Sequence, residues 1–97
     1  MPSYIALVDF TEQGMRNIKD SPARAEQFAE KARAFGATVK DAYWTTGAHD
    51  GVLIIEAPDD QSASALFLSL SQAGNVRTQT LSAYDRREMQ SIIGKLG

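Results

Sequence analysis

The apolar and polar positions along the chain repeat with two periods, of about two and about 3.6 residues, which are typical of strands and helices respectively. Residues 4–10 form a nearly continuous apolar run rich in strand-forming residues, and residues 52–57 form a second one. In both runs the odd-numbered and the even-numbered positions, which point to opposite faces of a strand, are apolar. Each run therefore predicts a strand that is covered on both faces. Residues 38–46 and 76–84 mix polar and apolar side chains and predict edge strands.

The first predicted long helix lies between the first two strands. Ser21 is expected to be its N-cap, with Pro22 at the first helical position. Apolar side chains then recur at helical spacing until Gly36 supplies the stop. A shorter helical stretch over residues 11–18 precedes this helix and breaks at residues 20–22.

Two further helices are predicted after the third strand. One opens at residues 58–60, carries an apolar stripe and ends at residues 74–75. The other begins with Asp85 and Glu88 in the spacing of a capping box and continues as an apolar stripe to the end of the chain.

The resulting order is β-α-β-β-α-β followed by a terminal helix, which is the ferredoxin-like arrangement. We therefore predict an α+β fold with a four-stranded antiparallel sheet, built as one domain over residues 1–97. This topology places the strands at residues 4–10 and 52–57 in the middle of the sheet. Those are the two most hydrophobic strands, so the pattern and the topology agree.

The two central strands predict that the chain does not act alone. Two helices cover only one face of a four-stranded sheet, and the apolar side chains of the other parity then remain open to water. A second copy packed sheet to sheet as a two-fold homodimer would cover them, with a typical interface of about 1,600 Å². In the alternative, the terminal helix from residue 85 folds back over that face.

The hairpin between the second and third strands sets which side chains share a face. A four-residue turn over residues 47–50 gives three expected pairs: Thr46 with Gly51, Tyr43 with Ile54, and Asp41 with Glu56. Tyr43 then shares a face with Asp41 and Glu56, whereas Trp44 joins Leu53 on the other. A slip of one residue would exchange the two faces of the second strand.

The composition narrows the classes of function. The chain has 97 residues, a formal net charge of −2 and no cysteine. The lack of cysteine excludes disulfides and thiol catalysis, and the lack of a basic run argues against nucleic-acid binding. With one histidine and no metal-binding spacing, neither a metal nor another cofactor is expected. No signal peptide or membrane span is predicted, so a cytoplasmic location is expected.

Several motifs spread over essentially the whole chain resemble the GYD domain family of small bacterial proteins. They are Tyr4-Ile5 with Phe10-Thr11-Glu12-Gln13-Gly14, Ile18-Lys19-Asp20-Ser21-Pro22 with Arg24, Tyr43-Trp44-Thr45-Thr46-Gly47 with Asp50, Pro58-Asp59-Asp60, and Gly74-Asn75-Val76-Arg77-Thr78 with Thr80. The resemblance implies a dimeric α/β barrel, in agreement with the homodimer inferred above. It implies no reaction, because the family has no established activity. One position departs from the family pattern: His49 stands where tyrosine is usual before the aspartate.

His49 and Asp50 are the candidate catalytic residues. An imidazole that titrates near neutral pH beside a carboxylate can transfer protons. In the alternative, both residues serve the turn, where neighbouring side chains often point apart and aspartate bonds its own backbone.

The candidate ligand-binding residues are Tyr43, Trp44, Arg24 and Arg77. Tyr43 and Trp44 are adjacent on a strand, so one is expected in the core and the other at a pocket or an interface. Arg24 and Arg77 could each bind an anion, or instead form salt bridges with Asp20 or Asp59.

Two other features of the sequence have a structural interpretation. Asp41 and Glu56 could form a paired-carboxylate site with a raised pKa, or lie exposed at the edge of the sheet. Gly14 is expected to allow close packing or a backbone bend.

Two functions follow from these patterns. The first is a small-molecule-binding domain with its pocket between helices and sheet or at the dimer interface. By analogy with other dimeric α/β barrels, it could have cofactor-free acid/base or oxygenase-like activity. The alternative is a non-enzymatic homo-oligomeric assembly or regulatory module.

Overall fold

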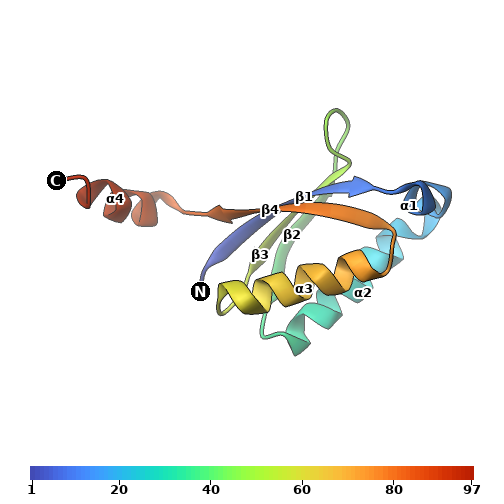
Figure 1. Cartoon of the computed structure of the whole chain (residues 1–97), viewed down its shortest axis with the longest axis horizontal. Helices are drawn as coiled ribbons and strands as arrows, with labels where there is room; N and C mark the ends of the chain where they lie inside the picture. Colours follow the sequence, from blue (N-terminus) through green and yellow to red (C-terminus); the bar gives the residue numbers. More distant parts are fainter.

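A four-stranded antiparallel sheet organises the chain, as a computed structural model of all 97 residues shows (Figure 1). The strands are β1 (Ser3–Phe10), β2 (Thr38–Trp44), β3 (Gly51–Glu56) and β4 (Val76–Ala83), in the order β2-β3-β1-β4. The ferredoxin-like topology is confirmed, and the two strands predicted to be central are central. Within one chain the sheet stays open and does not close into a barrel.

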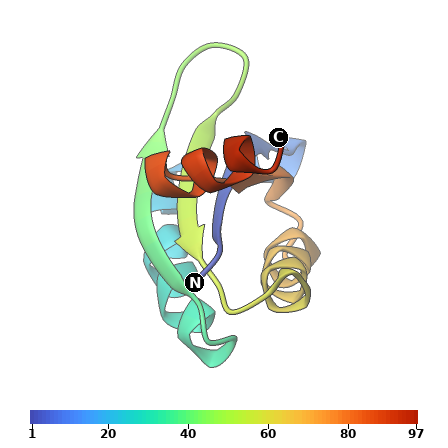
Figure 2. The same ribbon diagram turned by 90° about the vertical axis from the view of Figure 1, so that its left-hand side faces the viewer.

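The helices lie mainly on one side of this sheet. They are α1 (Glu12–Arg16), a 3₁₀ turn η1 (Ile18–Asp20), α2 (Ser21–Ala34), α3 (Asp60–Gln72) and α4 (Arg86–Gly94). Figures 1 and 2 show α2 and α3 side by side beneath the same face of the sheet. None of the five has the length and apolar character needed to cross a membrane.

The alternation of side chains along β1 decides what is buried. Tyr4, Ala6 and Val8 point towards α2 and α3 and are buried, whereas Ile5 and Leu7 point the other way and are only half-buried. The helix-covered side forms one core, whose members are Tyr4, Ala6, Phe28, Ala32, Ala37, Ile55, Ala57, Ala63, Leu66 and Phe67.

The other side of the sheet has no cover within the chain. We call it the open face; its apolar side chains are Ile5, Leu7, Val52, Ile54 and Leu81. The alternative in which the terminal helix folds back over this face is wrong. Instead α4 extends from the end of β4 away from the sheet, has no buried residue, and lengthens the molecule to 51 × 31 × 18 Å (Figures 1 and 2).

The β2–β3 hairpin differs in register from the prediction. Trp44 is opposite Gly51 and Tyr43 is opposite Val52, because the connecting loop has six residues, 45–50, rather than four. The Thr45 N–H donates to the Asp50 carbonyl (3.0 Å), which closes this longer loop. A shift of two residues preserves parity. The predicted sharing of faces is therefore kept, and the structure shows which face is which: Tyr43 lies on the open face and Trp44 on the helix-covered side.

A register shift between Val39 and Asp41 also affects the predicted pairing of carboxylates. Asp41 lies opposite Ile54, not Glu56, and is exposed. Glu56 instead forms an ion pair with Lys40, with 3.5 Å between Nζ and Oε1. The paired-carboxylate interpretation is therefore wrong.

Side-chain caps begin two of the predicted helices, and one of these caps is the predicted capping box. The Asp59 carboxylate accepts from the Ser62 N–H (2.7 Å), and this bond lowers the pKa of Asp59. Asp85 and Glu88 form the predicted capping box. At the start of α2, however, Ser21 is not an N-cap, because helical geometry already begins at Ser21 and its hydroxyl bonds elsewhere.

The start of α3 is also tied to the central strand. The Tyr4 hydroxyl donates a short hydrogen bond to the Asp60 carboxylate, and Tyr4 is buried. This bond, together with burial and the nearby negative charge of Asp60, raises the pKa of Tyr4 to about 12. The phenol therefore stays protonated as a donor at neutral pH.

The α1 segment packs against the turn between α3 and β4 and is hydrogen-bonded to it. The Thr11 N–H donates to the Asn75 carbonyl (3.0 Å), and the Gln13 side-chain amide donates to the Ala73 carbonyl (3.0 Å). Gly14 lies directly against this turn: a Cβ at Gly14 would be 1.9 Å from the Asn75 carbonyl oxygen. The predicted close packing at Gly14 is confirmed.

Candidate functional site

A cavity of about 220 Å³ lies between the sheet, α2 and α3. It sits at one end of the sheet, where β1 and β2 end and β3 and β4 begin. Most of its wall is apolar, with Val8, Phe10, Phe28, Leu53, Leu70 and Val76 among the lining residues. An apolar pocket with a few polar groups is the usual form of a small-molecule site.

Arg24 supplies a positive charge to this cavity. Its Nη1 donates to the backbone carbonyl of Asn17 (2.9 Å), whereas its Nη2 is buried and has no hydrogen-bond partner. The alternative in which Arg24 forms a salt bridge with Asp20 is wrong. One side of the guanidinium is therefore held by the backbone, and the other remains available.

Trp44 and Ser21 meet at the edge of the cavity. The Trp44 indole Nε1 donates to the Ser21 hydroxyl (2.9 Å), which joins β2 to the first residue of α2. Trp44 is 51 % exposed although it lines the cavity, so it stands where the cavity meets solvent. Tyr43, which is 57 % exposed, also lines the cavity at the edge of the sheet, although its side chain has the open-face direction. Neither residue lies in the core, so the expectation that one of them would is wrong.

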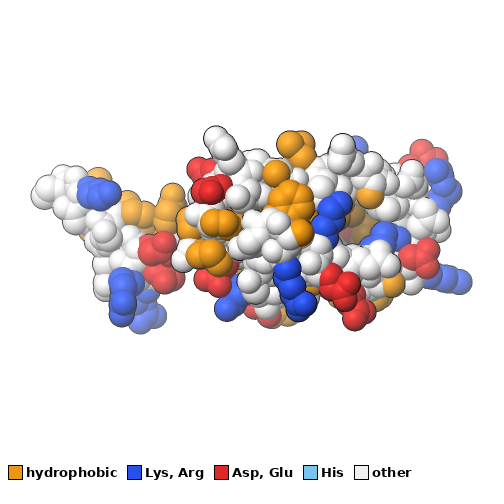
Figure 3. Space-filling model, turned by 90° about the horizontal axis from the view of Figure 1, so that it is seen from below, with side chains coloured by type: hydrophobic (Ala, Val, Ile, Leu, Met, Phe, Trp, Pro, Cys, Tyr) orange, Lys and Arg blue, Asp and Glu red, His pale blue; other side chains and the backbone are white.

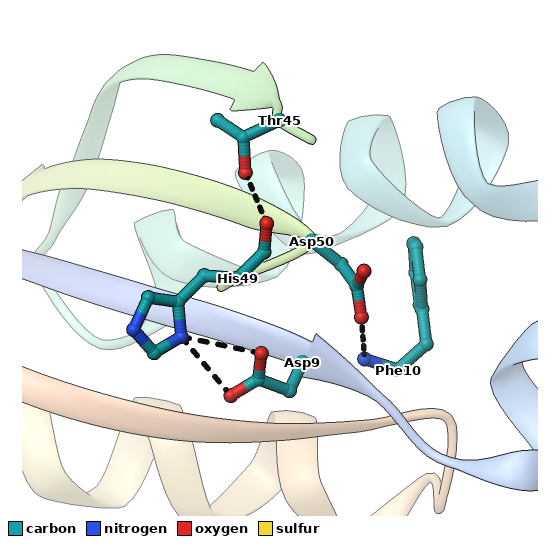
Figure 4. Close-up of polar contacts among 5 residues, drawn as sticks. All are labelled: Asp9, Phe10, Thr45, His49 and Asp50. Carbon is teal, nitrogen blue, oxygen red and sulfur yellow. Dashed lines mark hydrogen bonds and ion pairs between the residues drawn. The ribbon is translucent and has the colours of Figure 1, made fainter. Parts of the chain in front are cut away.

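His49 and Asp50 do not face each other: the two side chains diverge, one towards Asp9 and the other towards the Phe10 N–H (Figure 4). Asp50 lines the cavity, and its Oδ2 accepts from the Phe10 N–H (2.9 Å). The His49 side chain lies next to Asp9, whose side chain is on the open face. The His49 Nδ1 is 3.2 Å and 3.3 Å from the two carboxylate oxygens of Asp9.

The loop conformation causes this divergence. The Asp50 N–H donates to the Val8 carbonyl (2.9 Å), and the Thr45 hydroxyl donates to the His49 carbonyl (2.6 Å). These bonds fix the backbone of the loop at both residues, so that the two side chains leave it in different directions.

Arg77 also lies away from the cavity. It is exposed on β4 directly opposite Asp9 of β1, so it belongs to the same end of the open face as His49. It forms no salt bridge with Asp59 or with any other carboxylate. The structure therefore gathers Arg24, Tyr43, Trp44 and Asp50 around the cavity, and leaves His49 and Arg77 on the other side of the sheet.

Two site residues escaped the sequence interpretation. The sequence pattern predicts Ser21 as a helix cap. Nothing in the residues near Ser21 indicates its hydrogen bond to Trp44, which is 23 positions away. Asp9 pairs with His49, and here a signal exists: it is the only charged residue in the run 4–10 and shares the parity of Ile5 and Leu7. A charged side chain among the apolar ones on the uncovered face of a central strand indicates that it has a polar partner on that face.

The charged side chains on the surface around the cavity are of both signs, so they create no strong positive or negative electrostatic field there. Figure 3 shows the helix-covered side, where basic and acidic side chains are interspersed. No group of three or more histidine, cysteine, aspartate or glutamate residues is arranged to hold a metal ion. Any selectivity at the cavity must therefore come from the side chains that line it.

The fold and this cavity define a class: a small ferredoxin-like α+β domain with a ligand-sized space between its sheet and its helices. The chain belongs to the GYD domain family, whose model matches residues 4–93. No curated protein matches the chain in sequence.

Two solved structures are similar in fold. One is a feast or famine regulatory protein (Rv3291c) from M. tuberculosis complexed with L-methionine, with a TM-score of 0.63 and 21 % identity over 90 % of this chain and 55 % of that chain. The chain thus spans about half the length of that protein. The other is TTHA0845 from Thermus thermophilus, with a TM-score of 0.55 and 22 % identity over 88 % of this chain and 95 % of that one. At these identities the likeness concerns the fold alone.

Proposed function

We propose that this protein binds a small molecule in the cavity between α2, α3 and the sheet. The observation that carries the proposal is the cavity itself: about 220 Å³ of space, walled largely by apolar side chains and open beside Trp44. Apolar cavities of about 150 Å³ accept benzene-sized molecules, so a single ring with a short substituent would fit here.

The similar structures support the proposal only by analogy of fold. The M. tuberculosis protein is described as complexed with L-methionine, a small molecule of comparable size. A ferredoxin-like domain of this shape is therefore compatible with small-molecule binding and with a regulatory role.

Acid/base or oxygenase-like activity is the finer proposal that the sequence raised. An imidazole whose Nδ1 faces a carboxylate keeps its Nε2 for proton transfer, and His49 with Asp9 has this arrangement. Because both residues lie across the sheet from the cavity, we assign the cavity to binding. Any proton transfer by His49 would act on the open face.

The test uses Trp44, the only tryptophan in the chain, as a fluorescent reporter at the edge of the cavity. Three single-ring probes of different charge are titrated against the full chain: phenylacetate, phenylacetamide and 2-phenylethylamine. We expect at least one to change the Trp44 emission saturably. Ala25→Phe, which fills the cavity, should abolish that change.

Ala34→Phe is the matched control, because Ala34 is exposed on the same helix and does not line the cavity. It should leave the titration unchanged. If no probe gives a saturable signal, or if Ala25→Phe and Ala34→Phe behave alike, the cavity is not the binding site.

We also propose that the chain assembles as a homodimer through the open face. The supporting observation is the row of apolar side chains from the three strands β1, β3 and β4 that nothing in the chain covers. Two open sheets packed face to face would hide this row and would give the dimeric α/β barrel that the family resemblance implies.

Leu7→Lys tests this assembly. Leu7 lies on the central strand β1 between Val52 and Gln79, so a charge there would be buried in the middle of the interface. We expect the wild-type chain to sediment as a dimer at micromolar concentration and Leu7→Lys to sediment as a monomer. Leu68→Lys, the same substitution on the solvent side of α3, should remain dimeric. A monomeric wild-type chain would refute the proposed homodimer.

A further inference from the structure

Arg24, which lines the cavity, carries a charged hydrogen-bond donor that the protein does not satisfy. Arg24 Nη2 is the single buried side-chain nitrogen or oxygen in the chain without a partner. Buried polar groups are nearly always paired, because leaving one unpaired forfeits the hydrogen bonds it would make in water. An exception at the wall of an apolar cavity indicates that its partner comes from outside the chain.

A second donor stands beside it on the same helix. Ser21 precedes Arg24 by three residues, a spacing that puts both side chains on one face of α2, and both line the cavity. Ser21 is only 8 % exposed. Its oxygen accepts from Trp44, and because an indole N–H only donates, the hydroxyl proton of Ser21 remains free to be donated.

The charges around the cavity favour an anion. Its charged lining residues are Arg24 and Lys31, both on α2, and Asp50 on the side of the sheet. One oxygen of Asp50 is already occupied by the Phe10 N–H, so this carboxylate is partly neutralised by the backbone. The positive charges therefore gather along the α2 wall, where the two free donors are also found.

The rest of the wall limits what the anion can be attached to. Phe28, Leu53 and Leu70 leave an apolar space within a total of about 220 Å³. A compact apolar body fits there, whereas a large polar one would leave its own polar groups unpaired.

We infer that the ligand of this cavity is a small carboxylate with a compact apolar body, whose two oxygens take hydrogen bonds from Arg24 Nη2 and the Ser21 hydroxyl. This inference rests on the proposed binding function and names the chemical class of its ligand. Two donors on one helix face match the two oxygens of a carboxylate. Trp44, which holds Ser21, positions the second donor and does not bind the carboxylate itself.

The experiment compares three probes of one shape by calorimetry and by Trp44 fluorescence. Phenylacetate carries the carboxylate, phenylacetamide replaces it with a neutral amide, and 2-phenylethylamine carries a positive charge. Because an ionised acceptor strengthens a hydrogen bond about twofold over a neutral one, we expect phenylacetate to bind at least about tenfold more tightly than either analogue.

Variants on α2 then locate the preference. Arg24→Gln should weaken phenylacetate binding at least about tenfold and leave phenylacetamide binding nearly unchanged, since only the anion depends on the guanidinium charge. Arg33→Gln is the matched control: it removes the same charge from an exposed position on the same helix that does not line the cavity. Its binding of phenylacetate should equal that of the wild-type chain.

The outcomes separate this inference from the proposed function. If the amide or the amine binds as tightly as phenylacetate, the cavity is a binding site but its ligand is not a carboxylate. If Arg24→Gln and Arg33→Gln weaken phenylacetate equally, the preference is a general effect of charge and Arg24 does not hold the ligand. The comparison of probes on the wild-type chain decides the question even if Arg24→Gln fails to fold.

Discussion

Truncating Leu66 to alanine is expected to lower the free energy of unfolding by about 3 kcal/mol, within the range of about 2–5 kcal/mol found for such substitutions. Leu66 is one of the two largest side chains with no solvent exposure, and it packs from α3 into the core. Its removal would forfeit the burial of three carbon atoms and leave a cavity that the sheet cannot collapse to fill. For a domain of this size, this is a large part of the total stability.

Leu68→Ala provides the comparison for this prediction. Leu68 is on the same helix and undergoes the same chemical change, but it is 68 % exposed. Its free energy of unfolding should therefore stay within about 0.5 kcal/mol of the wild-type value. Urea unfolding of both variants at equal protein concentration measures the difference. Equal losses for Leu66→Ala and Leu68→Ala would mean that α3 does not pack on the sheet through this face.

Gly14→Ala should be about as damaging as Leu66→Ala, lowering the free energy of unfolding by about 3 kcal/mol. The added Cβ would lie 1.9 Å from the Asn75 carbonyl oxygen, a distance that no relaxed structure allows. Because the obstructing atom belongs to the backbone, either α1 or the α3–β4 turn must move. That movement would break the bonds from Thr11 and Gln13 to the turn.

Gly94→Ala is the control for this substitution. Gly94 lies in the last turn of α4 and has no atom near the position of an added Cβ. Alanine there should leave the stability unchanged or raise it by up to about 1 kcal/mol, because it favours the helix. Thermal unfolding of both variants gives the comparison. A Gly14→Ala chain as stable as Gly94→Ala would show that α1 is not held against the turn.

The strands and helices were predictable because local patterns specify them. The apolar residues of 4–10 and 52–57 predicted the central strands, and the capping box at Asp85 predicted the start of α4. The sequence also predicted that two helices would leave one face of the sheet open. Each of these statements depends on residues that are near one another in the chain.

The site was less predictable because it depends on contacts between distant segments. His49 and Asp50 are adjacent in sequence, yet the hydrogen bonds of the loop direct one towards Asp9 and the other towards the Phe10 N–H. Arg24 was singled out as an anion-binding residue, but its free nitrogen could be recognised only once the cavity was known. The sequence shows a motif around Gly14 and another around Asn75, but no local pattern predicts that the two are in contact.

The hydrogen bonds between the α1 segment and the α3–β4 turn join parts of the chain that are far apart in sequence: Thr11 and Gly74 are 63 positions apart. The second edge of the central strand β1 can likewise pair only after β4 has been made. Contacts of such long range are slow to form, since the intervening chain must first be ordered. A ribosome-bound nascent chain that stops before β4 would therefore lack Val76 of the cavity lining and the strand that pairs with the second edge of β1, so ligand binding is expected only after β4 has been made.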